Sequence, residues 1–332
     1  MVKNYIKYQK NVFTRFFPVA PGVWGLKNIF VNLYMILNHF DGNWVLVDAG
    51  LKGSSFKIKK MARQIFGEGA KPSAIILTHG HFDHVGALSK LAKEWNIPVF
   101  AHYLEIPFIT GKSSYPPGDP SVGGGFMSYM AWAYPTSPIN INNYANSLPE
   151  NGRVPGLPEW KYIHTPGHSP GHVSLFREND GVLIAGDAFV TTKAESAFST
   201  LLQLKKLCGP PKYLTYDWSL ARESVRILTA LDPEIAATGH GKPIKGEELR
   251  AALHQLSDHF YSAATPKSGR YIYEPAVTNA TGVVYIPANN INMRGLVIKI
   301  LSITAVSAMA YILFNTKKKK KKLNLLLDYE TW

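Results

Sequence analysis

The densest group of side chains that could do chemistry lies in the stretch THGHFDHVGA, residues 78–87. Within six positions it holds His79, His81, Asp83 and His84, in a chain with 11 histidines. Imidazole nitrogens and carboxylate oxygens are ligands for zinc and similar divalent ions. Because neighbouring side chains of a loop point in different directions, four such groups can serve two ions. The pattern H-x-H-x-D-H therefore predicts a metal site rather than an ordinary polar loop.

Three further stretches carry groups of the same kind. HTPGHSPGHVSLF holds His164, His168 and His172, VLIAGDAF holds Asp187, and AATGHGKP holds His240. Each stretch adjoins an apolar run that predicts a strand, so these side chains are expected at strand ends or on loops. A site for two ions needs ligands from several such ends, and this chain supplies them.

The elements that must position these groups follow from hydrophobic patterning. Short apolar runs predict strands, and longer runs with apolar residues three or four apart predict helices. Strands are expected at 30–37, 43–50, 73–77, 97–102, 160–165, 172–176, 181–186 and 233–238, and helices at 55–67, 85–95, 217–231 and 246–260. Asp41-Gly42, between the first two strands, suits a hairpin turn. The cluster at 79–84 follows the third strand directly, on a loop that leads into the helix at 85–95.

Residues 104–150 interrupt this alternation. The stretch is rich in glycine and proline, yet it carries a group of large apolar side chains: Phe126, Met127, Tyr129, Met130, Trp132 and Tyr134. Long loops in compact domains commonly have a function, and exposed aromatic groups favour that interpretation. We therefore expect a lid or a wall of a substrate site, with the packing of an extra helix as the alternative.

Composition limits the classes of protein that fit. The chain of 332 residues is 46% hydrophobic, so it can bury a large core. Its single cysteine, Cys208, excludes an internal disulfide and leaves metal binding to histidine and carboxylate. The net charge is +13, but much of it lies close to the C-terminal end, in lysines without interleaved aromatic residues. That arrangement argues against a nucleic-acid partner.

Taken together, the motifs resemble those of the metallo-β-lactamase superfamily, in which H-x-H-x-D-H is followed by His, Asp and His. The matching residues are His79, His81, Asp83, His84, His168, Asp187 and His240, and VDAG at 47–50 matches an early strand-end motif. The resemblance covers residues 20–245. It implies an α/β fold, an αββα sandwich with metal at the edge where strand-end loops meet. We expect residues 1–290 to form this domain and a C-terminal hydrophobic helix to follow it.

The resemblance also implies a role for each ligand. One zinc ion would be held by His79, His81 and His168, the other by Asp83, His84 and His240, and Asp187 would bridge them. A hydroxide bridging the two ions would be the nucleophile, and Asp83 would take up its proton. Two Zn²⁺ per chain are expected, with Mn²⁺ or Fe²⁺ as alternatives.

Three neighbouring residues are expected to support the ligands. His164 and His172 flank His168 and should pack at the strand end or hydrogen-bond to the ligands. Asp48 matches no ligand position, and in the family such an aspartate supports the metal loops through hydrogen bonds.

The substrate is indicated less sharply. Within the superfamily, HTPGHSPGHVSLF is most similar to acyl-homoserine lactonases, and glyoxalase-II-like thioesterases share a similar segment. The first hypothesis is therefore a dinuclear zinc hydrolase that opens a lactone or a related ester. Lactonases often place a tyrosine three residues after the bridging aspartate, where this chain has Val190, so Tyr213 or Tyr216 would have to substitute.

Two alternatives stay open. A thioester hydrolase of the glyoxalase II kind would need cations for the substrate carboxylates, and Lys242 and Lys245 are the candidates. A membrane-anchored binding protein without turnover is disfavoured by the complete ligand set.

The C-terminal region predicts membrane association. Residues 295–314 carry one charged side chain, Lys299, and are long enough to span a bilayer as a hydrophobic helix, a buried or interfacial helix being the alternative. The lysine-rich tail at 315–332 includes Lys317 to Lys322, which suit anionic lipid. The first thirty residues lack the apolar core of a secretory signal. We therefore expect attachment through 295–322 with the catalytic domain facing the cytoplasm, or, without attachment, a cytoplasmic enzyme.

Overall fold

The structure is a computed structural model, which describes residues 16–288. The expected hydrophobic helix at 295–314 and the lysine-rich tail at 315–332 lie outside the described residues. Between residues 16 and 288, no helix combines the length and the hydropathy that crossing a bilayer requires.

The first sheet has seven strands, in the order in which they occur along the chain. They are β1 (Phe16–Ala20), β2 (Val23–Asn28), β3 (Val31–Leu37), β4 (Trp44–Val47), β5 (Ala74–Ile76), β6 (Val99–Ala101) and β7 (Ala145–Ser147). The strands from β1 to β4 are antiparallel neighbours, whereas β4, β5, β6 and β7 run parallel. The hairpin expected at Asp41-Gly42 joins β3 to β4, with Gly42 at a φ of 75°.

The second sheet has six strands, ordered β13-β12-β11-β10-β9-β8. Their bounds are β8 (Arg153–Val154), β9 (Leu157–His164), β10 (Val173–Arg177), β11 (Val182–Gly186), β12 (Ile235–Thr238) and β13 (Ile244–Lys245). The pair β11 and β12 is parallel and the other neighbours are antiparallel. A separate hairpin is formed by β14 (Val277–Asn279) and β15 (Gly282–Tyr285).

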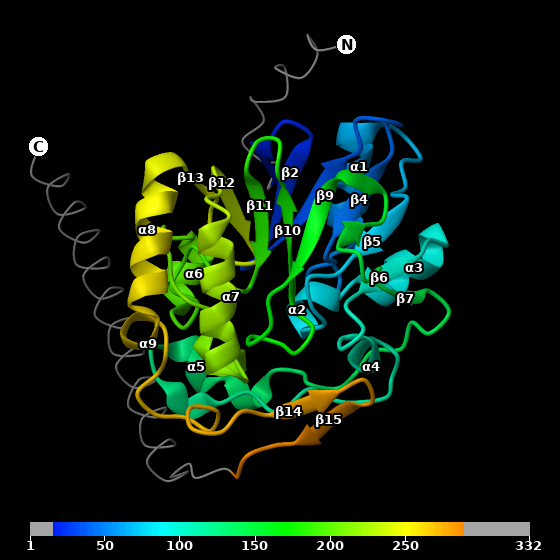
Figure 1. Cartoon of the computed structure of the whole chain (residues 1–332). Helices are drawn as coiled ribbons and strands as arrows, with labels where there is room; N and C mark the ends of the chain where they lie inside the picture. The colour runs from blue at the N-terminus through cyan, green and yellow to red at the C-terminus, as the bar shows by residue number, and fades with distance from the viewer. Residues whose placement is uncertain (1–15, 289–332) are drawn as a thin grey trace, which may run out of the picture. The chain divides into compact units, whose positions relative to one another are not determined.

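Helices cover the outer faces of both sheets (Figure 1). The long ones are α1 (Ser55–Phe66) and α3 (Leu88–Trp95) on the first sheet, and α7 (Trp218–Ala230) and α8 (Gly246–Asp258) on the second. The short ones are α2 (Phe82–Val85), α4 (Ile106–Ile109), α5 (Phe126–Tyr129), α6 (Ala197–Leu202) and α9 (Phe260–Ala263). Three 3₁₀ turns lie at Pro120–Val122, Ala131–Ala133 and Lys212–Leu214.

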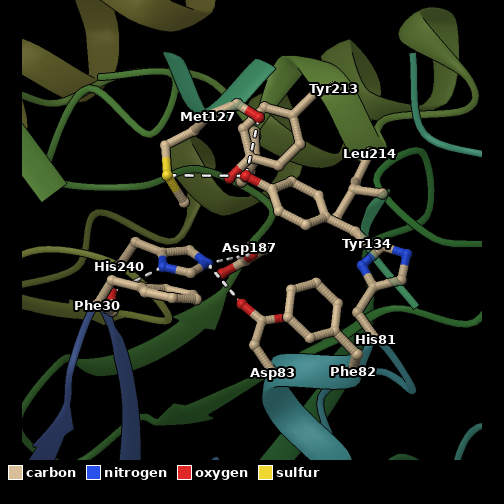
Figure 2. A pocket seen from close by; sticks show the side chains of 11 residues that line it. Phe30, His81, Phe82, Asp83, Met127, Tyr134, Asp187, Tyr213, Leu214 and His240 are labelled. Atoms are coloured by element: carbon tan, nitrogen blue, oxygen red, sulfur yellow. Dashed lines mark hydrogen bonds and ion pairs between the residues drawn. The ribbon is translucent and has the colours of Figure 1, made fainter. Parts of the chain in front are cut away.

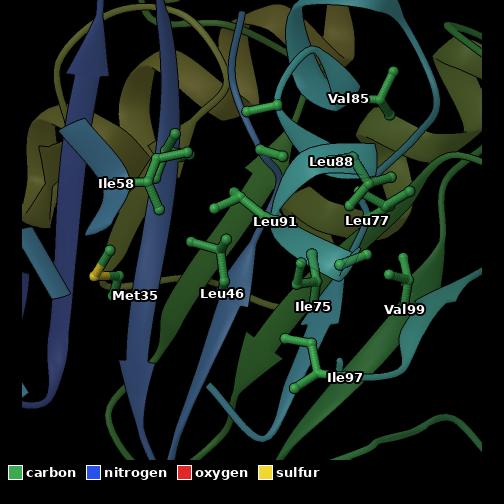
Figure 3. Packing of buried hydrophobic residues seen from close by; sticks show 14 of the residues in the cluster. Met35, Leu46, Ile58, Ile75, Leu77, Val85, Leu88, Leu91, Ile97 and Val99 are labelled. Carbon is green, nitrogen blue, oxygen red and sulfur yellow. The ribbon is translucent and has the colours of Figure 1, made fainter. Parts of the chain in front are cut away.

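The alternation of side chains along β4 shows why the sheets are buried on both faces. Leu46 packs among the side chains of α1 and α3, in the cluster that Figure 3 shows. Val45 and Val47 point the other way and pack against the second sheet, with Trp160 and Leu175. A strand buried on both faces is a continuous apolar run, as this one is. The second sheet likewise packs against α7 and α8. The expected αββα sandwich is therefore confirmed for the described residues.

One local expectation was wrong. The cluster at 79–84 does not lie wholly on a loop before a single helix at 85–95, because α2 and α3 are separate. Helix α2 ends before Gly86, whose N–H donates to the Gly50 carbonyl over 2.7 Å. A side chain there would meet the backbone nitrogen of Lys52 at 2.2 Å. This close approach ends α2 against the loop that follows β4, and it places Asp83 and His84 on a helical turn.

Residues 104–150 connect β6 to β7, and the last strand of the first sheet lies within them. The rest of this connection consists of α4, α5 and two of the 3₁₀ turns. Glycine and proline interrupt the stretch often enough to keep each helix to about one turn.

Candidate metal centre

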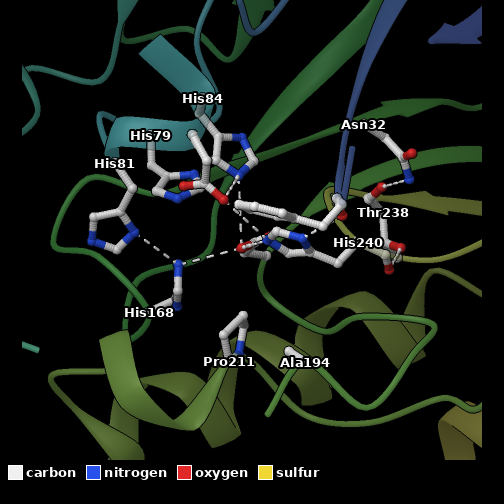
Figure 4. A network of polar contacts seen from close by, with 12 residues as sticks. Asn32, His79, His81, His84, His168, Ala194, Pro211, Thr238 and His240 are labelled. Carbon is white, nitrogen blue, oxygen red and sulfur yellow. Dashed lines mark hydrogen bonds and ion pairs between the residues drawn. The ribbon is translucent and has the colours of Figure 1, made fainter. Parts of the chain in front are cut away.

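Side chains from four separate segments of the chain converge at one edge of the sandwich (Figure 4). Three groups have one ligand atom per residue within 4.8 Å of one another: His79, His81 and His168; His79, His84 and Asp187; Asp83, His84 and His240. Each of the seven residues is at most 5% exposed. The first and third groups correspond to the two sets that the sequence indicates. Their roles as ligands stay a prediction, but the structure brings every expected residue to one place.

The convergence follows from the topology. The segment 79–84 comes after β5 of the first sheet, while His168 lies in the turn between β9 and β10, Asp187 follows β11, and His240 follows β12. Because β5 and β11 end at the same edge of the sandwich, residues far apart in sequence meet there. Gly239 makes the approach possible, since a side chain at this position would lie 2.0 Å from Oδ1 of Asp187.

Asp187 lies at the centre of the cluster. Its Oδ2 is 3.1 Å from Nε2 of His240, 3.5 Å from Nε2 of His168 and 3.7 Å from Nε2 of His84. Burial raises the pKa of this carboxyl, but His240 and His84 outweigh burial and hold the pKa well below its ordinary value. A carboxylate between the histidines of both groups is placed to bridge two cations.

Three histidines of the site are kept neutral. Burial lowers the pKa of His79 and His168 well below the ordinary value, and neighbouring histidines lower it further. The same causes bring the pKa of His81 to about 3. Neutral imidazole is the form that binds a metal ion.

Several buried atoms of the cluster lack partners. Among the described residues, Nε2 of His79, Nε2 of His84 and Oδ1 of Asp187 accept or donate no hydrogen bond. A buried polar atom without a partner costs about 1–3 kcal/mol, so three at one place need an explanation. Divalent cations would satisfy all three. The residues present therefore fit a metal centre.

Asp83, His84 and His240 form the more charged half of the site. Burial raises the pKa of Asp83. Burial lowers the pKa of His84 and of His240, but carboxylates outweigh it and raise both above the ordinary value, Asp48 chiefly for His84 and Asp187 chiefly for His240. Protons held here in the absence of metal would be released when a cation binds.

Asp48 supports the metal-binding segment as expected. Its Oδ1 accepts from the Thr78 N–H over 2.8 Å, and its Oδ2 accepts from the Thr78 hydroxyl over 2.7 Å. The same Oδ2 lies 2.8 Å from Nδ1 of His84. Asp48 has a φ of 62°, a conformation that aspartate tolerates better than most residues. One carboxylate thus orients both the start of the segment and one of its histidines.

The two histidines beside His168 differ in their surroundings. Nε2 of His172 accepts from the Asp187 N–H over 2.9 Å, and its Nδ1 lies 2.8 Å from the Thr165 hydroxyl. His172 therefore supports the backbone of the expected bridging residue. The ring of His164 instead stacks on His102, with centroids 4.0 Å apart, and it contributes to packing at the strand end.

Glu105 is a functional candidate that the sequence did not indicate. It is fully buried, and its carboxylate accepts from the Gly80 N–H over 2.9 Å and from the Gly171 N–H over 2.7 Å. The Ser169 hydroxyl donates to it over 2.9 Å, and the Tyr115 hydroxyl also hydrogen-bonds to it. Gly80 lies between His79 and His81, and Ser169 follows His168. Glu105 thus joins the two segments that carry the first group of three histidines.

A pocket opens beside Asp83, Asp187 and His240 (Figure 2). Its remaining wall is mostly apolar or aromatic: Phe30, Phe82, Met127, Tyr134, Pro211, Tyr213 and Leu214. Met127 and Tyr134 come from the 104–150 connection, which therefore contributes a wall of the pocket. Whether that connection also moves as a lid stays a prediction.

The two tyrosines expected to substitute at the site lie in different places. Tyr213 lines the pocket, whereas the hydroxyl of Tyr216 lies 3.3 Å from Nε2 of His81. Burial raises the pKa of both phenols well above the ordinary value. Both are therefore neutral hydroxyl groups, able to donate a hydrogen bond.

The model of the metallo-β-lactamase superfamily matches residues 27–240 of this chain. This range holds every residue of the cluster. The chain belongs to the metallo-β-lactamase superfamily. Its membership agrees with the sandwich and with the position of the site at the strand ends.

Relatives of known name support this assignment. Probable metallo-hydrolase YflN of Bacillus subtilis is 44% identical over 247 residues, which are 74% of this chain and 94% of that protein. A hydroxyacylglutathione hydrolase of Nitrosomonas eutropha is 28% identical over 174 residues, which are 49% of this chain and 54% of that protein. The crystal structure of BJP-1, a subclass B3 metallo-β-lactamase of Bradyrhizobium japonicum, shares the fold with a TM-score of 0.50 at 19% identity and covers 75% of this chain and 92% of that one.

Proposed function

We propose that this member of the superfamily is a dinuclear zinc-dependent hydrolase that opens a lactone or a related ester. At the coarser level the chain is a metal-dependent hydrolase with a His/Asp cluster able to bind divalent ions. The observation that carries the proposal is the convergence of two donor groups on Asp187, next to an apolar pocket. Zinc suits a site of imidazole and carboxylate, and Mn²⁺ or Fe²⁺ remain alternatives.

Two ions bound here would supply a water of lowered pKa and an electrophile for the substrate carbonyl. Protein side chains would transfer protons and donate hydrogen bonds to the substrate. Asp83 borders the pocket, with Oδ2 3.5 Å from Nε2 of His240, and would accept the proton of the attacking water. The neutral hydroxyl of Tyr213 would donate to the substrate carbonyl or to the departing oxygen. Hydrolysis adds the water oxygen to the acyl carbon, breaks the bond between that carbon and the ester oxygen, and transfers a proton to the departing oxygen, which becomes the alcohol.

The character of the pocket favours a lactone or ester over a glutathione thioester. None of the described residues that line it is a lysine or an arginine. A glutathione moiety carries two carboxylates and would be expected to meet cations, whereas the apolar side chains of Phe30, Met127 and Leu214 suit an uncharged substrate. The thioesterase alternative is supported by the Nitrosomonas relative, a hydroxyacylglutathione hydrolase by name. The third alternative, a membrane-anchored binding protein without turnover, is disfavoured by the presence of all seven groups.

A substrate panel tests the proposal. The purified full-length protein, loaded with zinc, would be assayed with a lactone, a thioester, a β-lactam and a phosphodiester. We expect the lactone to be hydrolysed fastest, the rate to vanish on chelation, and water labelled with heavy oxygen to place label in the product carboxylate. Fastest turnover of the thioester would favour the alternative, and activity that survives full metal depletion would exclude both.

The proposed location is the cytoplasmic side of a membrane, with attachment through 295–322. The apolar segment and the lysines that follow it in the sequence support this proposal. Extraction of a membrane fraction with alkaline carbonate tests it. Retention in the pellet supports a spanning helix, release supports peripheral attachment, and protein free of membranes at low salt contradicts both.

A further inference from the structure

A group of apolar side chains on and after α6 faces solvent. Phe198 is 67% exposed, Leu201 53%, Leu202 54% and Leu204 45%. We call these four residues the α6 patch. Single exposed apolar residues are ordinary on a soluble protein, but four within seven positions form a contiguous surface that commonly marks an interaction site.

Hydrogen bonds fix α6 to the elements around the metal centre. Lys27 Nζ donates to the Leu201 carbonyl over 2.6 Å, and Gln203 Nε2 donates to Oδ1 of Asn32 over 3.2 Å. These contacts tie the helix to β2 and β3, whose connecting turn contains Phe30. Phe30 lines the pocket, and its ring stacks on His240 with centroids 6.1 Å apart. Helix α6 is therefore fixed to the two strands whose connecting turn borders the pocket.

Most of the charged residues around the α6 patch are lysines, because Glu195 is buried and Glu248 is paired with Lys205. Residues 196–216 contain three lysines, Lys205, Lys206 and Lys212, and no aspartate or glutamate. Lys193 precedes the helix, and both Lys193 and Lys206 are exposed. Within the part of the chain that the structure describes, Lys205 pairs with Glu248, whereas Lys193 and Lys206 form no ion pair. Two exposed cations that lie within five residues of the patch in sequence are thus left for an external partner.

The combination of exposed apolar side chains with unpaired lysines distinguishes between possible partners. The cores of protein interfaces are depleted of lysine, so a second copy of the chain or another protein is a poor match. A lipid surface takes exposed Phe and Leu side chains at the headgroup boundary and attracts lysines through anionic headgroups. We propose that the α6 patch, with Lys193 and Lys206, docks on a membrane that contains anionic lipid. The proposal does not depend on the identity of the substrate.

The consequence is a second point of lipid contact, separate in sequence from residues 295–322. Because α6 is fixed to the strands whose connecting turn contains Phe30, docking would hold the Phe30 side of the pocket towards the lipid. A lipophilic substrate would then enter with less exposure to water.

Site-specific fluorescence tests this surface in the full-length chain. Cys208→Ser would remove the single native cysteine, and Leu202→Cys would then carry an environment-sensitive dye. The matched control is Phe40→Cys, at a position 75% exposed in the turn between β3 and β4. That turn lies at the end of β3 away from the centre, because the other end of β3 contacts Gly239 through the Asn32 N–H over 2.7 Å. Circular dichroism and metal content would verify that both labelled proteins are folded.

Vesicles of phosphatidylcholine with phosphatidylglycerol should shift the emission of the dye at position 202 to shorter wavelength. The dye at position 40 should not respond, and vesicles of phosphatidylcholine alone should have a weaker effect. Reversing two charges with Lys193→Glu and Lys206→Glu should raise the lipid concentration for half of the shift by about tenfold or more. Lys71→Glu, an exposed lysine before β5, is the control for charge and should change little.

Three outcomes would overturn the proposal. Protein that sediments with vesicles while the dye at position 202 stays unchanged must bind through another segment. A shift that grows with protein concentration without lipid indicates a second copy on the patch. Equal shifts with neutral and anionic vesicles, unaffected by reversal of the lysines, would exclude recognition of anionic lipid.

Discussion

The carboxylate of Asp48 fixes the imidazole of His84, with Oδ2 2.8 Å from Nδ1. When the ring is neutral, this contact keeps the proton on Nδ1 and leaves Nε2, which makes no hydrogen bond among the described residues, free for a cation. Asp48 also accepts two hydrogen bonds from Thr78. Asp48, the first residue after β4, therefore determines the tautomer of His84, a candidate ligand that comes after β5.

Asp48→Asn should weaken metal binding by about 10- to 100-fold while preserving the fold. The amide oxygen can still accept from the Thr78 N–H, but the amide NH₂ would face Nδ1 of His84 and force the proton onto Nε2. Competition with a chelator measures the affinity, and Asp258→Asn, at an exposed position on α8, is the matched control. Unchanged affinity in Asp48→Asn would mean that the ring orientation is set elsewhere.

Asp187→Ala should reduce the metal content from two ions per chain and abolish most of the hydrolysis. Its Oδ2 lies within 3.7 Å of nitrogens from three histidines, so its removal leaves both groups without their shared carboxylate. Elemental analysis of the purified variant gives the metal content directly. Two full equivalents in Asp187→Ala would contradict the bridging role, as would less than one equivalent in active wild-type protein.

Much of the site could be predicted because most of the candidate ligands lie immediately after strands. A strand is visible as an apolar run, and the ends of β5, β11 and β12 must meet at one edge once the sandwich forms. The resemblance in motif then assigns His168 and His240 despite their distance in sequence from His79. The separation of α2 from α3 could not be predicted, because it depends on the contact of Gly86 with Gly50.

Residues that act through tertiary contacts were harder to predict. Glu105 is a single glutamate in an irregular segment, and its partners Gly80 and Gly171 are 25 and 66 positions away. No local pattern indicates that one carboxylate receives both backbone N–H groups. Phe30 likewise reaches the pocket only because the turn between β2 and β3 packs against His240. These contacts exist only after the two sheets have come together.

Glu105→Gln should lower metal affinity, and Glu105→Ala should do so more strongly and destabilise the fold by about 3–5 kcal/mol. Each carboxylate oxygen of Glu105 accepts hydrogen bonds from two of the four donors around it. Glutamine keeps one of these oxygens but replaces the other with an NH₂ group, which cannot accept from the remaining two donors. Glu178→Gln, at a side chain 60% exposed, is the matched control. Chelator competition and denaturant unfolding of the metal-free protein separate the effect on the site from that on the fold.

A role limited to stability predicts a different result for Glu105→Gln. The variant would then unfold more easily but bind metal with wild-type affinity and keep its kcat once loaded. A positioning role predicts a lower kcat at saturating metal, because the segments that carry His79 and His168 are no longer held together. An unchanged kcat together with unchanged affinity would therefore refute the positioning role.

Stability at acid pH should depend on His172. Burial, and to a smaller extent neighbouring histidines, lowers the pKa of His172 to about 3, while Asp187 acts to raise it. Its Nε2 accepts from the Asp187 N–H over 2.9 Å, which requires the neutral ring. The unfolded chain binds this proton near pH 6.5, so between pH 6.5 and 3 the unfolded state holds more protons than the folded state. The contribution of His172 to the free energy of unfolding is therefore fully present above pH 6.5 and is lost as the pH falls.

His172→Gln isolates this effect from that of the other buried histidines. The glutamine carbonyl can accept from the Asp187 N–H and cannot be protonated in this range. In the metal-free protein at neutral pH, we expect the variant to be about 1–2 kcal/mol less stable than wild type, because the imidazole packing and the bond to Thr165 are lost. This deficit in the free energy of unfolding should shrink by about 2–3 kcal/mol between pH 6.5 and 4.5, so that the variant becomes the more stable protein.

Denaturant unfolding at a series of pH values measures the difference between His172→Gln and wild type. A deficit that stays constant with pH would show that His172 does not resist protonation in the folded state. His172→Asn, whose shorter amide does not reach the Asp187 N–H, should be less stable than His172→Gln at every pH.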